Sequence, residues 1–488
     1  MTNNNLSLLT VFLFIMFPLI LAELARKKAF PTAEDFFLQS RTMSTAMTFF
    51  TVYATWMSIF AFLGATTYFY ESGPVYTTAI AWDALFGVGF FYIGKKMWFY
   101  GKRNKYITPT NFFTDIYGSK TLSLLVVIVL MVFTFPYLQI QLSGGAYLIE
   151  IATQGVIPWR VSGMLFYAII VIYLWAGGLR AVAMADVFYA ICLFLSMVYI
   201  GFYLAEEAGG TAYVFNEIID LNVKNVTLPG PQGDAGPLLW ICLFISVPLG
   251  VLMGPQMWIR AYAVEKERTF NAMPVLITLM AIQCIGPMLA GSAGILLAPN
   301  IAQADRLIPM LLIKSGNMFF AMILFCGIAA AALSSANSLI HALATIYTID
   351  IHKRYINGKA TDKQLFNIAK IAVVIISATA YLLLLKHPTI IMETGILGFG
   401  GVSQIAVATI GAFFWKRSNA KAAICGLLCG VLSVLFFSFV MEFNTAYSCV
   451  LGLLLNSGVF IVLSLLLKPE KAVADKIVLY RETYRNRT

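Results

Sequence analysis

The chain has 488 residues, of which 60% are hydrophobic and only 11% are charged. This composition excludes an ordinary water-soluble globular protein, in which about 25% of the residues are charged. A net charge of +10 would suit nucleic-acid binding, but the positions of the basic residues indicate a membrane topology instead and no nucleic-acid partner.

Apolar stretches long enough to cross a bilayer, about 20 residues each, recur from one end of the chain to the other. They predict an all-α integral membrane protein with thirteen transmembrane helices. The predicted spans are 6–26, 44–69, 76–98, 121–147, 158–177, 179–204, 236–260, 268–297, 317–349, 365–386, 389–415, 420–440 and 444–467. The first span follows no basic segment and precedes no clear cleavage site, so we interpret it as a retained helix and not as a signal peptide.

The basic residues alternate between the two sides of these spans. If the N-terminus lies outside, the inner loops and the tail hold 28 of the 33 Lys and Arg residues. The outer loops hold the other five, which are Arg160, Lys224, Arg306, Lys314 and Lys386. This follows the positive-inside rule. We therefore expect a multi-pass protein of a bacterial inner membrane, with the N-terminus outside and the C-terminus in the cytoplasm.

Two spans carry signs of an interrupted helix. The second contains the polar cluster Tyr53-Ala54-Thr55-Trp56-Met57-Ser58 at its middle, and the seventh contains two prolines and two glycines within 248–255. Broken helices at matching places in two halves of a chain indicate a transport site. Because the two spans are five apart, and five is odd, a repeated five-helix unit would be inverted in the membrane.

Two acids lie further from the span ends than the others, Asp83 in the third span and Asp186 toward the inner end of the sixth. A carboxylate in lipid is costly, so we expect each to face the bundle interior or water. For Asp186 the alternative is an interfacial acid paired with Arg180. No Lys or Arg is predicted to lie deep in the spans.

The ninth span contains Ala331-Ala332-Leu333-Ser334-Ser335-Ala336-Asn337-Ser338. Its serines at i, i+1 and i+4 share one face, which suits a bare cation coordinated by oxygens, but small residues also favour plain helix–helix packing. The cysteines and histidines lack metal-site spacing, and no phosphate loop or nucleophile motif is present. We therefore expect neither an enzyme nor a cofactor.

Several motifs, taken together, resemble those of the sodium:solute symporter family over nearly the whole chain. They are Ala33 to Arg41, an inner motif that ends in Arg41, followed by Trp175 to Asp186, Pro255 to Arg260, Ala331 to Ser338 with Thr348 to Asp350, and Phe414 to Lys421. The resemblance implies a LeuT-type fold in which helices 2–6 and 7–11 are two inverted repeats and helices 1, 12 and 13 are peripheral. The implied segments are 1–43 (first helix and inner loop), 44–204 (first repeat), 205–235 (outer loop), 236–415 (second repeat), 416–467 (peripheral helices) and 468–488 (cytoplasmic tail).

The resemblance also implies site residues. The sodium ligands would be the carbonyls of Ala54, Met57 and Ala331 and the hydroxyls of Ser334 and Ser335. A second sodium, or else an inner gate, would involve Asp186, Asn337 and Ser338. The solute would contact Trp56, Ser58, Asp83, Gln141 and Gln404. Packing remains the alternative for Trp56, and interhelical hydrogen bonds remain the alternative for Asn337 and Gln404.

The predicted function is therefore sodium-coupled import of a small organic solute by alternating access, with Na⁺ as the coupling ion and the chain acting as a monomer. An organic acid, a vitamin or an amino acid would all fit. The stretch from Gln141 to Ala146 resembles pantothenate carriers, whereas an ionised Asp83 would favour a zwitterion or a hydroxyl-rich solute. The alternatives are a proton-coupled carrier, with Asp83 or Asp186 as the proton site, and a solute sensor that does not transport.

Overall fold

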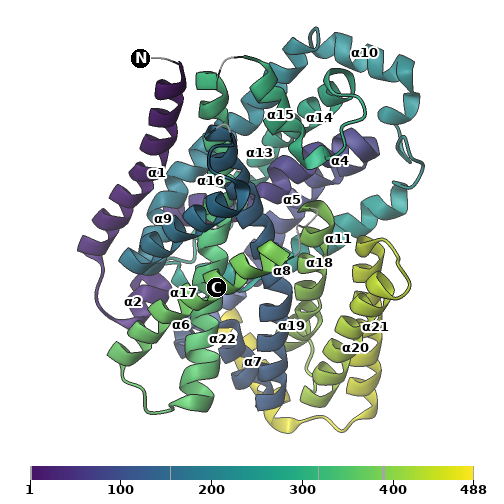
Figure 1. Cartoon of the computed structure of the whole chain (residues 1–488). Coiled ribbons are helices and arrows are strands. Elements are labelled where there is room, and N and C mark those ends of the chain that lie inside the picture. The colour runs from purple at the N-terminus through teal and green to yellow at the C-terminus, as the bar shows by residue number, and fades with distance from the viewer. Residues whose placement is uncertain (1–2, 154, 317, 387–390, 487–488) are drawn as a thin grey trace.

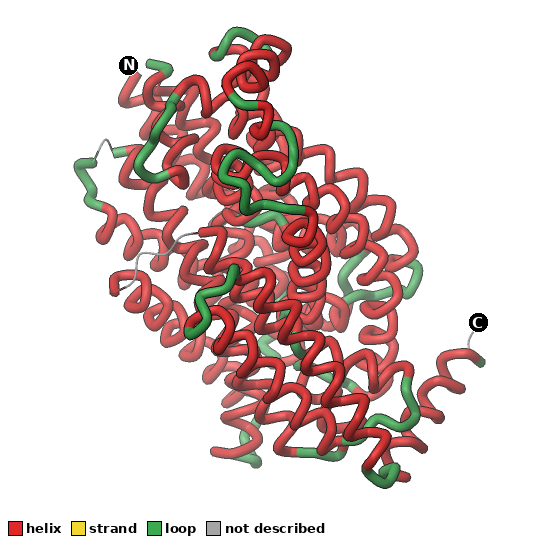
Figure 2. The backbone as a smooth tube through the Cα atoms, turned by 90° about the vertical axis from the view of Figure 1, so that its right-hand side faces the viewer, coloured by secondary structure: helices red, strands yellow, loops and turns green. Residues whose placement is uncertain are grey.

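The computed structural model describes residues 3–486 except 154, 317 and 387–390. Every named element in these residues is a helix (Figure 2), and an isolated parallel bridge joins Met43 to Val264. The all-α prediction is thus confirmed. The first residues of the predicted spans 317–349 and 389–415 lie outside the described residues.

The helices of the first half are α1 (Asn3–Lys28), α2 (Ala33–Leu38), α3 (Thr45–Trp56), α4 (Ala65–Ser72), α5 (Thr78–Gly89), α6 (Lys95–Asn104), α7 (Pro109–Tyr117), α8 (Lys120–Ala152), α9 (Trp159–Glu207) and α10 (Thr211–Leu221). Those of the second half are α11 (Pro237–Met253), α12 (Pro255–Ala263), α13 (Thr269–Met280), α14 (Ile285–Leu297), α15 (Leu307–Lys314), α16 (Met318–Ile346), α17 (Asp362–Lys386), α18 (Ile391–Ser403), α19 (Ile405–Phe414), α20 (Ala420–Phe439), α21 (Thr445–Leu466) and α22 (Lys471–Arg485). Two short π-helical segments continue neighbouring helices: η2 (Phe60–Gly64) leads into α4, and η4 (Phe90–Gly94) joins α5 to α6.

Among the described residues, ten helices are long and apolar enough to cross a membrane, or eleven if the bent pair α11 and α12 is one span. Two of the ten, Phe60–Asn104 and Trp159–Glu207, are 45 and 49 residues long. At 1.5 Å per residue each is long enough for two crossings of a hydrocarbon core about 30 Å thick. The count of thirteen spans stays a prediction.

Both predicted helix breaks are present. Helix α3 ends at Trp56, where Met57 adopts an extended conformation with φ −85° and ψ 95°. This break contains neither Gly nor Pro. Helix α11 ends at Met253, and Gly254 turns the chain into α12 at an angle of 54°.

The long helix α9 is interrupted at Gly178, between the predicted fifth and sixth spans. Gly178 has φ 52° and ψ −141°, a backbone conformation that favours glycine. A Cβ atom at this position would also lie only 2.6 Å from the carbonyl oxygen of Phe36. A glycine is therefore required where α9 passes over α2.

Helix α16 lies at the centre of the bundle. In its most apolar 18-residue window 83% of the residues are buried, against 33% in α20 and in α21. It packs against α8, α9 and α3. Helix α1 lies along one edge of the molecule, and α20 and α21 pair at the opposite edge (Figure 1). The central helix is thus the one that carries the predicted cation site.

The tail helix α22 docks on α7 through one carboxylate. Lys476 Nζ lies 2.8 Å from Asp115 Oδ1, and the hydroxyls of Tyr480 and Tyr106 donate to Asp115 Oδ2. Burial opposes the charge on Asp115, but the hydrogen bonds from Lys476, Tyr106 and Tyr480 outweigh it and lower the pKa of this carboxyl. The tail therefore remains attached to the body at neutral pH.

Helices α9 and α14 cross very closely at Gly286. A Cβ atom at Gly286 would lie 1.9 Å from the carbonyl oxygen of Met197. We expect Gly286→Ala to push the helices apart and to lower stability by about 1–3 kcal/mol, measured as a fall in the thermal unfolding midpoint of the detergent-purified protein. The control is Gly458→Ala in α21, where a Cβ atom meets nothing within 4 Å. An unchanged midpoint in Gly286→Ala would contradict the close crossing.

Candidate functional site

The break after α3 is held open by two polar side chains. The amide of Ile59 donates to Gln141 Oε1 at 3.2 Å, and the amide of Phe60 donates to Ser58 Oγ at 3.1 Å. In a continuous helix these amides would bond to the carbonyls of Thr55 and Trp56. The break therefore frees backbone oxygens at the middle of the bundle, and their former donors are satisfied elsewhere.

Two hydroxyls of α16 contact backbone carbonyl oxygens in the last turn of α3, beside this break. Ser334 Oγ donates to the carbonyl of Ala54 at 2.8 Å and lies 3.2 Å from the carbonyl oxygen of Ala331. Ser335 Oγ donates to the carbonyl of Thr55 at 3.2 Å. All of these residues are buried. Neutral oxygens gathered at an unwound helix are the arrangement that binds Na⁺ in transporters.

The structure thus brings together four of the five predicted sodium ligands, namely Ala54, Ala331, Ser334 and Ser335. The carbonyl of Thr55 joins them and was missed from the sequence. A backbone oxygen leaves no signature in its own side chain, so only the position of the break would have indicated it. Met57, the fifth predicted ligand, lines the adjacent cavity.

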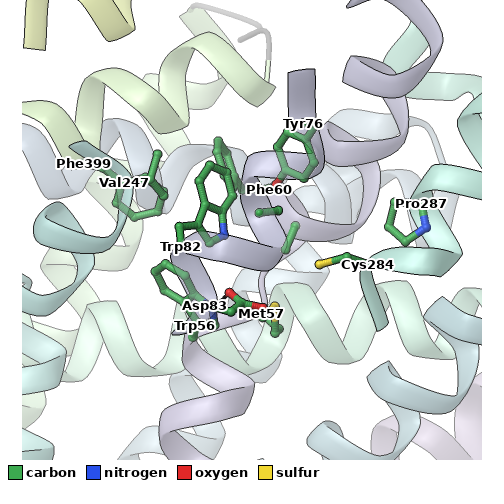
Figure 3. Close-up of a pocket in the computed structure, with 12 residues that line it drawn as sticks. Trp56, Met57, Phe60, Tyr76, Trp82, Asp83, Val247, Cys284, Pro287 and Phe399 are labelled. Carbon is green, nitrogen blue, oxygen red and sulfur yellow. Dashed lines mark hydrogen bonds between the residues drawn. The ribbon is translucent and has the colours of Figure 1, made fainter. Parts of the chain in front are cut away.

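A small cavity is lined by Trp56 and Met57, the residues at the break after α3 (Figure 3). Its volume is about 20 Å³, which is room for about one water molecule. Trp56 and Asp83 line it, and Trp56 Nε1 donates to Asp83 Oδ1 at 2.6 Å. The Trp56 ring stacks on Phe86 with a centroid distance of 4.5 Å. Two of the predicted solute-contacting residues therefore meet at one cavity.

The other three predicted solute-contacting residues do not line this cavity. Ser58 and Gln141 serve the break described above, and Ser58 also accepts a 2.7 Å hydrogen bond from Tyr137. Gln404 donates to the carbonyls of Gly400 and Cys449, which joins α18 to α21. The alternative of an interhelical hydrogen bond therefore describes Gln404 better than solute contact does.

A buried ion pair lies next to the serine hydroxyls of α16. Arg260 Nη2 lies 3.2 Å from Asp186 Oδ2 and also donates to Ser338 Oγ. Arg260 Nε donates to Thr51 Oγ1 at 3.0 Å, and Thr51 in turn donates to Asp186. The Arg260 and Asp186 side chains are only 1% and 0% exposed. A fixed guanidinium therefore contacts the acid and one hydroxyl of the predicted second sodium site.

The structure bears on two interpretations of these charges. Arg260, placed by the sequence at the inner end of the seventh span, is fully buried, so a basic residue does lie deep in the bundle. Asp186 does not pair with Arg180, which instead contacts Asp35 at 2.7 Å. The break at Gly254 is the reason, because it turns α12 and Arg260 inward. Asn337 is buried on α16 with no hydrogen-bond partner for its amide among the described residues.

Arg41 of the inner motif joins the loop after α2 to the α6–α7 connection. Its Nη2 donates to the carbonyl of Tyr106 at 2.8 Å, and its Nε lies 3.0 Å from Glu34 Oε1. Together with the Met43–Val264 bridge, these contacts close the end of the bundle beyond Arg260.

The family model described as "Sodium:solute symporter family" matches residues 36–430. The chain belongs to the sodium:solute symporter family. It is 25% identical to the sodium/pantothenate symporter of Escherichia coli (strain K12), over 93% of this chain and 95% of that protein. It is also 25% identical to the osmoregulated proline transporter OpuE of Bacillus subtilis (strain 168), over 75% of each.

The fold is that of solved transporters. A Na⁺-coupled sialic acid symporter in a substrate-bound outward-open state superimposes with a TM-score of 0.82 and 18% identity, over 95% of this chain and 98% of the other. The LeuT-type fold predicted from the motifs is confirmed. As a family member the chain is a multi-pass membrane protein and a sodium-coupled solute symporter, not an enzyme.

Proposed function

We propose that the symporter imports one solute molecule with one Na⁺ per cycle. The ion is held by the carbonyls of Ala54, Thr55 and Ala331 and the hydroxyls of Ser334 and Ser335, with the Met57 carbonyl completing the set as the break opens. The solute occupies the cavity at Trp56 and Asp83. The observation that carries the proposal is the contact of the α16 hydroxyls with the carbonyls freed at the helix break.

Alternating access follows from this position. The ion joins α3 in the repeat 44–204 to α16 in the repeat 236–415, so its binding favours one relative orientation of the two repeats. The cavity is too small for an organic solute in this conformation, so the two repeats must move before a solute binds or leaves. Both sites are built from one chain, and we propose that a monomer transports.

A single Na⁺ per cycle follows from the buried ion pair. Asp186 and Ser338, which would hold a second Na⁺, are already bonded to Arg260. We therefore assign these residues to an inner gate, on the side that carries most of the basic loops. We propose that this side is the cytoplasm of a bacterium, with the N-terminus outside.

One inward charge is sufficient for accumulation. At 100 mV it contributes about 2.3 kcal/mol, or about 50-fold, before the sodium gradient is counted. The relatives transport pantothenate and proline by their names, so an organic acid, a vitamin or an amino acid remains the expected class of solute.

The test is a panel of radiolabelled solutes offered to proteoliposomes that contain the purified protein. We expect uptake of at least one solute to require an inward Na⁺ gradient, with a Hill coefficient for Na⁺ near 1. Uptake driven equally by a pH gradient in the absence of Na⁺ would overturn the proposal in favour of proton coupling. A Hill coefficient near 2 would overturn the single-sodium assignment alone.

A further inference from the structure

The cavity at Asp83 has a lining that is unusual for an anion or a neutral solute. Its twelve lining residues comprise one carboxylate, five aromatic side chains and no Lys, Arg or His. They are Trp56, Met57, Phe60, Ala61, Tyr76, Ala79, Trp82, Asp83, Val247, Cys284, Pro287 and Phe399. A solute anion would therefore face a like charge with no cation in the cavity wall.

One of the two oxygens of this carboxylate has no hydrogen-bond partner in the described part of the chain. Asp83 is fully buried, and its Oδ1 accepts from Trp56. Its Oδ2 has no hydrogen-bond partner within the described part of the chain. A buried carboxylate without a counter-charge is costly. An ammonium group in the cavity would supply both the positive charge that the lining lacks and a donor to Oδ2.

The aromatic rings surround the same space. The Trp82 and Tyr76 rings meet edge to face, with their centroids 5.1 Å apart. The centroid of the Phe60 ring lies 6.3 Å from that of Trp82 and 5.3 Å from that of Phe399. These rings and Trp56 line one cavity with the carboxylate (Figure 3). Aromatic faces attract organic cations through the ring quadrupole.

We infer that the transported solute carries a primary or secondary ammonium group, which donates an N–H to Asp83 Oδ2 inside this aromatic enclosure. This inference rests on the proposed function of the cavity. It excludes simple carboxylates and sugars as preferred solutes. A quaternary ammonium would satisfy the charge but not the vacant acceptor, so it ranks below an amine that keeps an N–H.

Cys284 lines the same cavity, so it reports on the charge preference without knowledge of the solute. Protein in proteoliposomes with saturating Na⁺ is treated with 2-aminoethyl or 2-sulfonatoethyl methanethiosulfonate. Modification of Cys284 is followed by peptide mass spectrometry, and each rate is divided by the rate with free 2-mercaptoethanol. We expect the cationic reagent to react at least 10-fold faster after this correction, and Asp83→Asn to bring the ratio close to 1.

Ratios of 1 or below in the wild-type protein would overturn the inference, as would a preference that Asp83→Asn leaves intact or a failure of both reagents to reach Cys284. If Asp83→Asn does not fold, the ratio of the cationic to the anionic rate in the wild-type protein still tests the inference. Asp83→Glu keeps the charge and should keep this ratio above 1.

Uptake of matched solutes separates this inference from the proposed function. L-alanine, L-lactate, betaine and D-glucose are compared with and without a Na⁺ gradient. Sodium-driven uptake of lactate or glucose, with no uptake of alanine, would leave the symporter proposal standing and overturn the ammonium assignment. A cationic preference at Cys284 without sodium-driven uptake of any solute would overturn the symporter proposal and leave only the preference of the cavity for a cation.

Discussion

The double substitution Ser334→Ala and Ser335→Ala is expected to abolish sodium-driven uptake at ordinary Na⁺ concentrations. In the proposed site each hydroxyl supplies one oxygen to the ion, and an interaction of a charged group with such an oxygen contributes about 1.5–3 kcal/mol. Losing two should raise the Na⁺ concentration for half-maximal uptake by at least about 100-fold. The measurement is initial uptake in proteoliposomes as a function of external Na⁺.

A matched control separates ion binding from packing. Ser403 on α18 is equally buried, but its hydroxyl donates only to the carbonyl of Gly400 in its own helix. We expect Ser403→Ala to leave the Na⁺ dependence unchanged. A double variant with an unchanged half-saturating Na⁺ concentration would show that Ser334 and Ser335 serve only in packing and that the cation site lies elsewhere.

Replacing Arg260 by Met is expected to be strongly destabilising, because it leaves Asp186 charged and buried without its partner. Breaking a buried pair from one side costs about 3–5 kcal/mol. We expect a large fall in the thermal unfolding midpoint and loss of uptake. The double variant Arg260→Met, Asp186→Asn removes both charges and should recover much of the stability.

An exposed pair provides the comparison. Arg26 and Glu23 form an ion pair on α1 with side chains 59% and 45% exposed, and such pairs contribute about 0–1 kcal/mol. Arg26→Ala should therefore leave the midpoint nearly unchanged. Equal stability of Arg260→Met and the wild-type protein would show that the guanidinium does not neutralise Asp186. Recovery of stability without recovery of uptake in the double variant would assign the pair to gating.

The sequence alone predicted an all-helical membrane protein, because that information is local, whereas the LeuT-type fold was implied by the family resemblance. A stretch of about 20 apolar residues enters the bilayer through its own composition, and the distribution of Lys and Arg predicts which loops stay inside. The break in the seventh span was also indicated by local sequence, since Gly254 followed by Pro255 favours the end of one helix and the start of the next. The break in the second span was harder to predict, because the partner that stabilises it, Gln141, is 82 residues from Ile59.

The cation site was predicted from a resemblance, and its packing alternative could not be rejected from spacing. Three serines on one helical face look alike whether they contact lipid, another helix or an ion. The contact of Ser334 with Ala54 spans 280 residues, and only the tertiary structure shows that these hydroxyls meet freed carbonyls.

By itself the sequence determined that this protein is helical and lies in a membrane, and it indicated two helix breaks. Only the tertiary structure decided which charges meet. Arg180 lies close to Asp186 in sequence, yet Asp186 pairs with Arg260, 74 residues away. The physical reason is that a buried charge must find an opposite charge in three dimensions, and the bend at Gly254 brings Arg260 to it.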